Sequence, residues 1–363
     1  MIYDFEEFAD LIATLRSCSI PIRPKEPKTC SVVPLLRDGH FTSADFLEHW
    51  ALGVPVVVSE VDKRLQGRWH PDDFAREYGA QKVSPVDCVS NKVIKPAWTV
   101  SDFFGYLKDP GKSKVAMKLK DWPPSKSFSD TFKDLYRGFL RSIPVLCQDM
   151  ARVDGVLNLA AHFPKNGNVP DLGPKMYIAT GPKGHGDRYG TTKLHLDVTD
   201  AINLLPWCAD PTRPAAVWHI FPADSAGVLR QYLRDIHPDA PSCDPIHSQG
   251  IYISDDMMSQ LASRGVRPWT IFQRYGDAVF IPAGCAHQVS NLQSAIKVAC
   301  DFVSVQNLER TLSLLQDQRA HRIHGNGPED VLQLHILLWY AWLSVTTCSK
   351  QTYQDESDSV LAQ

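Results

Sequence analysis

The spacing of apolar residues divides the chain into segments of different character. Residues 2 to 16 place apolar side chains at three- and four-residue intervals, which predicts an amphipathic helix that ends at the prolines of residues 21 to 27. From about 30 to 170, short apolar runs alternate with helical stretches and prolines. We therefore expect residues 1–29 to form a helix and a Pro-rich linker, and residues 30–170 to form a mixed α/β scaffold.

The pattern becomes strand-like between residues 175 and 305. Gly, Pro, Asn and Asp turns separate apolar runs over residues 193–198, 215–221, 270–272, 278–281 and 295–303. These runs predict an α+β fold with a mainly β core, in which residues 171–308 form a double-stranded β-helix of the cupin or jelly-roll type. The stretch from about 222 to 268 is expected to be a large insertion.

The C-terminal part returns to helical patterning. Residues 328 to 345 are apolar nearly all round, so we expect a helix that is buried against the barrel or in a homodimer interface. The LHILL sequence inside it also fits an LxxLL peptide, but a packed helix explains it better. We assign residues 309–347 to C-terminal helices and residues 348–363 to a disordered tail.

Composition and charge narrow the functional classes. With 38 basic and 41 acidic side chains the net charge is -3, which lacks the basic excess of a protein that grips DNA, while a basic peptide substrate is compatible with it. Nine cysteines without a CxxC pair predict a reducing compartment. An acidic N-terminus and no apolar run of about 18 residues predict a soluble intracellular protein without a membrane span.

Four His-x-Asp pairs occur in the chain, where chance predicts roughly 1.5 His-x-acid pairs. The pairs that begin at His70, His185 and His237 have Pro or Gly in the middle, so they belong to turns or helix starts. His195 and Asp197 instead flank a leucine on a predicted strand, where residues two apart face the same side. Two imidazoles and one carboxylate are the ligands of non-haem Fe(II) oxygenases, so this pair predicts an iron site.

The stretch from Tyr275 to Val303 supplies the third ligand of this site. It reads as a Gly-Asp turn, a strand, a Pro-Ala-Gly corner, a histidine, an Asn-Leu turn and a second strand. Such a hairpin delivers the distal ligand in cupin barrels, so we expect His287 to complete the set. A satisfied structural pair is the alternative for His195 and Asp197.

At these residues the chain resembles the JmjC-domain Fe(II)/2-oxoglutarate oxygenases, and within them the branch of histone H3 lysine-9 demethylases related to the hairless protein. Matching stretches include MKLKDWPP, DGVLNLA, PDLGPKMY, YGTTKLHLDVTDA, VWHIF, DPIH and GDAVFIPAGCAHQVSNL. These stretches lie between Met117 and Leu292, and the resemblance as a whole covers roughly residues 30 to 345. The resemblance implies Fe(II), 2-oxoglutarate and O2 as cofactor and cosubstrates. The implied reaction is oxidation of lysine N-methyl groups with release of formaldehyde, CO2 and succinate. It also implies a methylated histone tail as partner and a nuclear location.

The resemblance also implies residues for the distal carboxylate of 2-oxoglutarate. Thr192 occupies the position of a carboxylate-binding hydroxyl, and Asn158 resembles an amide donor of related branches. The usual family lysine, two residues before a tryptophan, is Ala216 here. We expect Lys297 to replace it, because strand alternation places residues 297, 299 and 301 on one face, with Arg213 as the second choice and a surface role for Lys297 as the alternative.

The resemblance assigns two residues to the substrate. Tyr177 matches a tyrosine that flanks the methyl-lysine in relatives, with core packing as the alternative. Asp301 is expected to face the cavity, where it would receive a methylammonium group or serve as a structural acid. Larger relatives carry a cysteine-rich zinc module, which this chain lacks, so it is a compact or trimmed member. A JmjC protein hydroxylase, a catalytically silent chromatin scaffold and a metal cupin without oxygenase activity remain as alternatives.

Overall fold

A computed structural model of the protein describes residues 32–112, 116–164, 166–181, 190–237, 244–323 and 330–361. The predicted helix over residues 2 to 16 lies outside these ranges, as does the His185 pair. Among the described residues, no helix combines the length and the apolar character needed to cross a membrane.

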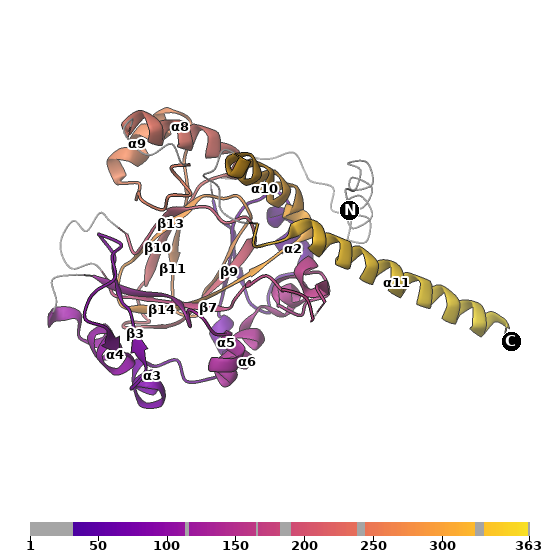
Figure 1. The fold of residues 1–363 in the computed structure, drawn as a ribbon, viewed down its shortest axis with the longest axis horizontal. Helices are drawn as coiled ribbons and strands as arrows, with labels where there is room; N and C mark the ends of the chain where they lie inside the picture. Colours follow the sequence, from indigo (N-terminus) through magenta and orange to yellow (C-terminus); the bar gives the residue numbers. More distant parts are fainter. Residues whose placement is uncertain are drawn as a thin grey trace.

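Two β-sheets form the two walls of a barrel (Figure 1). In spatial order, the large sheet contains β1 (Leu35–Arg37), β2 (Val56–Ser59), β12 (Ala278–Ile281), β9 (Asp200–Cys208), β14 (Ala295–Phe302), β7 (Lys175–Ala179), β6 (Met117–Trp122) and β4 (Val86–Asp87). The small sheet contains β11 (Trp269–Gln273), β10 (Ala216–Ile220), β13 (His287–Asn291) and β8 (Thr192–His195). A separate pair is formed by β3 (Lys82–Val83) and β5 (Trp98–Thr99). This arrangement is the predicted double-stranded β-helix.

Successive strands of the barrel cross from one sheet to the other. β12 and β14 belong to the large sheet, whereas β13 between them belongs to the small one. The hairpin predicted for this stretch is therefore wrong, because its consecutive strands do not pair with each other. Its turns and strands are present. The Pro-Ala-Gly corner carries the chain across, because Gly284 adopts a φ of +81° that other residues rarely adopt.

Helices surround the barrel (Figure 1). The N-terminal half contributes α2 (Ser43–Trp50), α3 (Pro71–Tyr78), α4 (Val100–Lys108), α5 (Phe128–Thr131), α6 (Lys133–Ser142) and α7 (Gln148–Ala151). The predicted insertion contains α8 (Ala226–Ile236) and α9 (Asp255–Ser263), and the C-terminal part contains α10 (Leu308–Ile323) and α11 (Leu334–Leu361). Short 3-10 turns cover Val61–Arg64, Pro110–Lys112, Val145–Cys147, Leu159–His162 (η4), Ala223–Ser225 and Val305–Asn307.

The predicted boundary near residue 170 does not divide two sheets. β2 from the N-terminal scaffold pairs with β12, and β6 pairs with β7, so both segments build the large sheet. The C-terminal helix begins at Leu334 rather than near 328, and it continues into the segment that we expected to be a disordered tail. No Gly or Pro interrupts residues 334–361, so no residue in this stretch breaks the helix.

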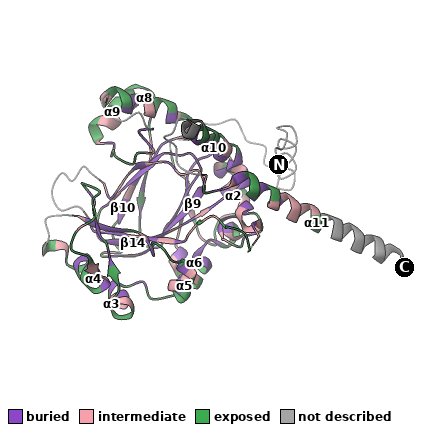
Figure 2. Ribbon diagram, viewed as in Figure 1, coloured by how far each residue is buried: buried purple, intermediate pink, exposed green. Residues whose placement is uncertain are grey.

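Alternation along the large sheet separates an outer apolar face from an inner face. On β14, Ile296, Val298 and Phe302 pack outward against a cluster of aromatic side chains from α2, α3, α4 and α6. The intervening Lys297 and Asp301 line a cavity inside the barrel, as the alternation predicted. Figure 2 shows the same division, with buried strands in the centre and exposed surfaces on the outer helices. The large sheet thus buries its outer face against helices and presents polar side chains among the residues that line the cavity.

Candidate metal centre

Three candidate ligands converge where β8 meets β13. The two strands pair antiparallel with His287 opposite His195, and the ring centroids lie 4.1 Å apart. Asp197 follows the end of β8, and its Oδ2 lies 3.9 Å from His195 Nε2 and 3.6 Å from His287 Nε2. One ligand atom from each residue lies within 4.8 Å of the other two. Side chains 92 residues apart in sequence are therefore placed around one point, as the sequence predicted.

Backbone carbonyls fix the orientation of both imidazoles. His195 Nδ1 lies 2.9 Å from the carbonyl oxygen of Lys193, and His287 Nδ1 lies 2.9 Å from that of Cys285. Because a carbonyl only accepts, each Nδ1 must carry the proton, which leaves the Nε2 lone pair facing the ligand cluster. Burial, and then the neighbouring His195, lower the pKa of His287, so its ring is held neutral. Imidazoles whose Nδ1 is fixed by a carbonyl in this way are pre-oriented as metal ligands.

The three ligands leave one side of the centre open. His287 is buried, whereas the side chains of His195 and Asp197 are 18% and 38% exposed towards a cavity of about 280 Å³. Two imidazoles and one carboxylate on one side of an ion, with free positions opposite, fit the donor set of non-haem Fe(II) centres.

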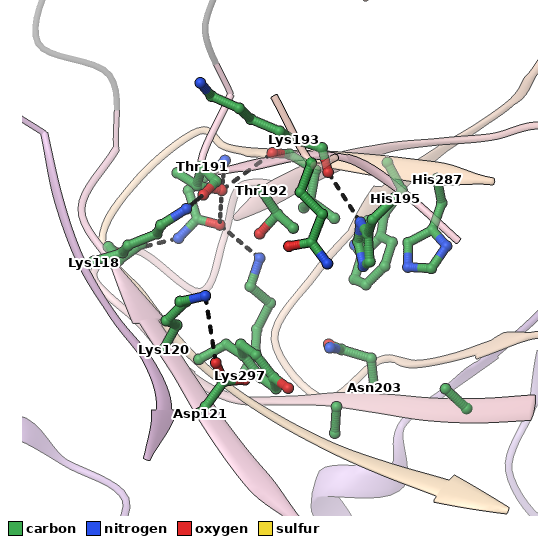
Figure 3. A pocket seen from close by; sticks show the side chains of 18 of the residues that line it. Lys118, Lys120, Asp121, Thr191, Thr192, Lys193, His195, Asn203, His287 and Lys297 are labelled. Atoms are coloured by element: carbon green, nitrogen blue, oxygen red, sulfur yellow. Dashed lines mark hydrogen bonds and ion pairs between the residues drawn. The ribbon is translucent and has the colours of Figure 1, made fainter. Parts of the chain in front are cut away.

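The far end of the cavity carries lysine side chains. In Figure 3, His195 and His287 stand at one end, the side chains of Lys118, Lys120 and Lys297 gather at the other, and Thr192 lies between. Lys297 is 4% exposed, and burial lowers its pKa to about 7. Its Nζ donates to Asn291 Oδ1 at 2.6 Å and lies 5.6 Å from the ring centre of Trp218. A surface role for Lys297 is therefore wrong.

Two residues at this end were missed by the sequence analysis. Lys118 is 8% exposed and its Nζ donates to the carbonyl oxygen of Thr191 at 2.9 Å. Asn291 is held by a hydrogen bond from its Nδ2 to Ala179, at 3.1 Å, which directs its Oδ1 towards Lys297. A lysine inside an apolar strand run was the available signal for Lys118, since such a residue needs a buried partner or a ligand.

Asn158 and Arg213 lie elsewhere. Asn158 caps η4, accepting hydrogen bonds from the amides of Ala160 and Val303 at 3.1 Å, and it is not among the residues that line the cavity. Its expected contact with the cosubstrate is therefore corrected to a structural role. The side chain of Arg213 is 71% exposed and pairs with Asp210 outside the cavity.

Tyr177 and Asp301 both line the same cavity as the ligands. Tyr177 on β7 pairs with Lys297 on β14, and burial together with the carboxylates of Asp121 and Asp301 raises its pKa well above the usual tyrosine value. Burial and the neighbouring Asp197 raise the pKa of Asp301, which also forms a hydrogen bond with Thr199. The phenol stays protonated, and the Asp301 carboxyl is shifted towards its neutral form.

Comparison with known proteins agrees with this geometry. The two-sheet barrel and its His-x-Asp and distal His define a metal-binding cupin. Residues 186–302 match the family model described as "JmjC domain, hydroxylase". This part of the chain belongs to the JmjC domain family.

Its relatives include named demethylases. The chain is 38% identical over 342 residues to lysine-specific demethylase 3A-B of Xenopus laevis, covering 82% of this chain and 25% of that protein. It is 36% identical over 341 residues to human lysine-specific demethylase 3A, with 82% and 26% covered. For lysine-specific demethylase JMJ26 of Arabidopsis thaliana the identity is 31% over 368 residues, with 82% and 42% covered. The chain thus spans about a quarter of the length of the first two relatives.

Proposed function

We propose that the chain is an Fe(II)- and 2-oxoglutarate-dependent oxygenase that removes methyl groups from histone lysine side chains, with mono- and dimethylated lysine 9 of histone H3 as its target. The single observation that carries the proposal is that one cavity has two chemically different ends. An open His195, Asp197 and His287 cluster stands at one end, and the desolvated Lys297 stands at the other. A cosubstrate with a chelating end and a distal carboxylate needs both.

The residues at the metal end fit Fe(II). The two histidines would bind through Nε2 and Asp197 through its carboxylate, because both Nδ1 atoms are committed to carbonyls. When bound, the metal with 2-oxoglutarate and O2 supplies the oxidising chemistry that converts an N-methyl group to formaldehyde, with CO2 and succinate as the other products. The chain itself orients the ligands and shields His287 from solvent.

The residues at the lysine end fit a distal carboxylate. Within the described residues, Lys297 donates one hydrogen bond, to Asn291, and an ammonium has three donors, so two remain for an anion. The Thr192 hydroxyl lies beside this position and supplies a neutral donor. An ion pair formed in so dry a pocket is stronger than one at the surface.

Tyr177 and Asp301 are suited to hold the methylated ammonium near the metal. A carboxyl and a phenol accept hydrogen bonds from the N–H of a mono- or dimethylammonium, and a trimethylammonium has no such donor. This chemistry supports the proposed methylation states. A nuclear location follows from a histone substrate and belongs to the same proposal.

Formaldehyde release from methyl-lysine histone peptides tests the proposal. We expect formaldehyde and succinate in equal amounts from the wild type and neither from His195→Ala. His70→Ala is the matched control, because His70 also begins a His-x-Asp pair but caps α3 at the surface, and it should retain activity. Formation of succinate without formaldehyde on every methylated peptide would contradict demethylation.

A protein hydroxylase is the second candidate, favoured by the description of the matching family model. The metal end of the cavity serves both reactions. Mass spectrometry separates them, because demethylation removes a CH2 for each methyl group and hydroxylation adds an oxygen. A catalytically silent scaffold would convert no 2-oxoglutarate with any peptide.

A homodimer through α11 is a further part of the proposal. Leu334, Leu337 and Leu338 pack against the body, while Ile336 and Trp339 on the same helix are 47% and 36% exposed. Substitution of both Ile336 and Trp339 by glutamate should convert a dimer to a monomer, as measured by sedimentation. Either single substitution should weaken self-association several-fold. A wild-type chain that sediments as a monomer at all concentrations would contradict the dimer.

A further inference from the structure

Residues with unusual backbone geometry gather around the cavity. In the described part of the chain, five residues other than glycine have a positive φ: Glu60, Asn91, Asp121, Gln249 and Gln333. Three of these five, Asn91, Asp121 and Gln249, line the metal cavity. They come from three separate segments, namely the turn after β4, strand β6 and the insertion between α8 and α9. Left-handed backbone is costly for residues with a Cβ and persists where surrounding contacts impose it, often at functional sites.

The turn that holds Asn91 is fixed by its own hydrogen bonds. The amide of Asn91 donates to the carbonyl of Asp87 at 2.9 Å, and the Asp87 carboxylate accepts from the amides of Val89 and Ser90. Asparagine tolerates this conformation better than most residues, so the turn alone would be ordinary. Its position on the cavity, with an exposed side chain, is what distinguishes it.

The segment that presents Gln249 is anchored on both sides. Before it, the buried Asp244 pairs with Arg230 and accepts hydrogen bonds from the amides of Ile246 and His247. After it, Ile253 exchanges two hydrogen bonds with the side chain of Gln288, at 2.7 and 2.9 Å, directly next to the ligand His287. The insertion is therefore fastened to the strand that carries a metal ligand, and the side chain of Gln249 is left exposed at the cavity.

Asp121 lies at an irregularity in β6. The register with β7 shifts between Leu119 and Trp122, and Asp121 falls within this shift. Its carboxylate lies 3.6 Å from Lys120 Nζ and forms a hydrogen bond with Tyr177, while its side chain remains 51% exposed. This acid therefore contacts Tyr177 while about half of its side chain remains exposed at the cavity.

We propose that Asn91, Asp121 and Gln249 form a polar collar that binds the backbone of the substrate polypeptide on both sides of the modified lysine. This inference rests on the proposed function and adds the residues that read the peptide. An extended peptide presents N–H and C=O groups that need partners when it is bound. Amide side chains both donate and accept, and a carboxylate accepts from N–H groups. Rigid left-handed backbone keeps these side chains in place before the peptide arrives.

Glycine substitutions test the collar without adding backbone strain. Asn91→Gly and Gln249→Gly remove the side chain at positions where glycine adopts the same φ freely. Gln333→Gly is the matched control, because Gln333 is also a left-handed glutamine but does not line the cavity. Asp121→Asn keeps a residue that tolerates the conformation while removing the charge. Gln249→Asn, which shortens the amide side chain but keeps it, should restore part of the binding.

Two substrates separate the collar from the catalytic centre. On a histone peptide, each collar variant should raise the peptide KM about three- to tenfold and the Asn91→Gly, Gln249→Gly double variant by roughly the product. On Nα-acetyl methyl-lysine amide, which has no flanking residues, these glycine variants should match the wild type. The affinity of a fluorescent peptide, measured by anisotropy with Mn(II) and 2-oxoglutarate present, should fall in parallel, and the KM for 2-oxoglutarate should not change.

An unchanged peptide KM in both glycine variants would overturn the collar, as would an equal loss on the peptide and on the single amino acid. Effects in Gln333→Gly as large as those in Gln249→Gly would also overturn it, because loop stability would then be the cause. If the wild type acts on no peptide at all, the proposed function fails and the collar fails with it. A wild type that is active on peptides with unaffected variants refutes the collar alone.

Discussion

Two aspartates three residues apart, Asp197 and Asp200, follow the same strand but sit in opposite environments. Asp197 is 38% exposed, and its carboxylate faces two imidazoles and an open cavity. Asp200 is 1% exposed and accepts four hydrogen bonds, from the amides of Ala283 and Ser304, the Ser304 hydroxyl and the Asn307 amide group, at 2.6–3.0 Å.

This difference separates a binding group from a structural one. The donors around Asp200 satisfy both of its oxygens, and they tie the start of β9 to the Pro-Ala-Gly corner and to the segment before α10. The amide of Gly284 in that corner donates to the backbone carbonyl of Asp197 at 3.1 Å. Asp200 therefore stabilises the loop that presents Asp197, whose own carboxylate is left available to an ion.

Removal of the open carboxylate should have the largest effect. We expect Asp197→Ala to lower succinate formation at least about 100-fold, because loss of even a supporting group outside the ligand set costs 10- to 100-fold. The apoprotein should unfold at nearly the wild-type temperature, since Asp197 supports no buried structure. Thermal unfolding with and without Mn(II) checks the cause: the ion should stabilise the wild type and not the variant. Stabilisation of both by the ion would mean that the carboxylate is not a ligand.

Asp200→Asn should mainly lower stability and leave most of the activity, the reverse of Asp197→Ala. An amide offers one acceptor oxygen and turns an NH2 group towards donors, so at least one buried donor loses its partner. We expect a loss of about 3 kcal/mol in the free energy of unfolding, measured by urea denaturation. Activity per folded molecule should fall by no more than about tenfold, at the low end of what loss of a supporting group costs, because the Asp197 carboxylate itself remains. A stable variant with no activity would place Asp200 among the functional residues and contradict its structural role.

The cluster of candidate metal ligands was predictable because its sequence signal is local. A His-x-Asp pair with an apolar middle residue, and a histidine after a Pro-Ala-Gly corner, each stand in a short stretch of sequence. Lys297 was predictable for a similar reason, since alternation along β14 alone decides which face it occupies. The double-stranded β-helix followed from these strands and their turns.

Features that depend on distant partners were not predictable. β9, the longest strand in the described part of the chain, was not predicted, and Pro206 within it is a residue that disfavours central strands. The structure accommodates it where the pairing with β14 shifts between Ile296 and Val298. Asn158 was assigned to the cosubstrate from neighbouring residues alone, whereas its partner Val303 is 145 residues away. The four donors of Asp200 likewise come from residues 83 to 107 positions later in the chain.

Lys297 shares features with both aspartates. The pH dependence of cosubstrate binding tests whether it is a binding residue like Asp197 or a structural one like Asp200. Like Asp200 it is buried, and like Asp197 it keeps hydrogen-bonding capacity for a ligand. Burial lowers its pKa from 10.5 to about 7, so the free protein loses this charge as the pH rises through 7, while the unfolded chain keeps it up to about 10.5. This group therefore makes folding less favourable at pH 7 than at pH 10, which is opposite to what a stabilising ion pair would do.

The proposed cosubstrate, 2-oxoglutarate, would need the charged form of this lysine. Above pH 7 the KM for 2-oxoglutarate should rise about tenfold per pH unit, because a proton must be bound together with the dicarboxylate. Lys297→Met should show weaker binding at pH 7 and no such rise, which steady-state kinetics between pH 6.5 and about 8.5 would reveal. Calorimetry in buffers of different ionisation enthalpy should detect proton uptake in the wild type only. A KM that is flat with pH in the wild type would instead indicate that Lys297, like Asp200, is already satisfied by its protein partners.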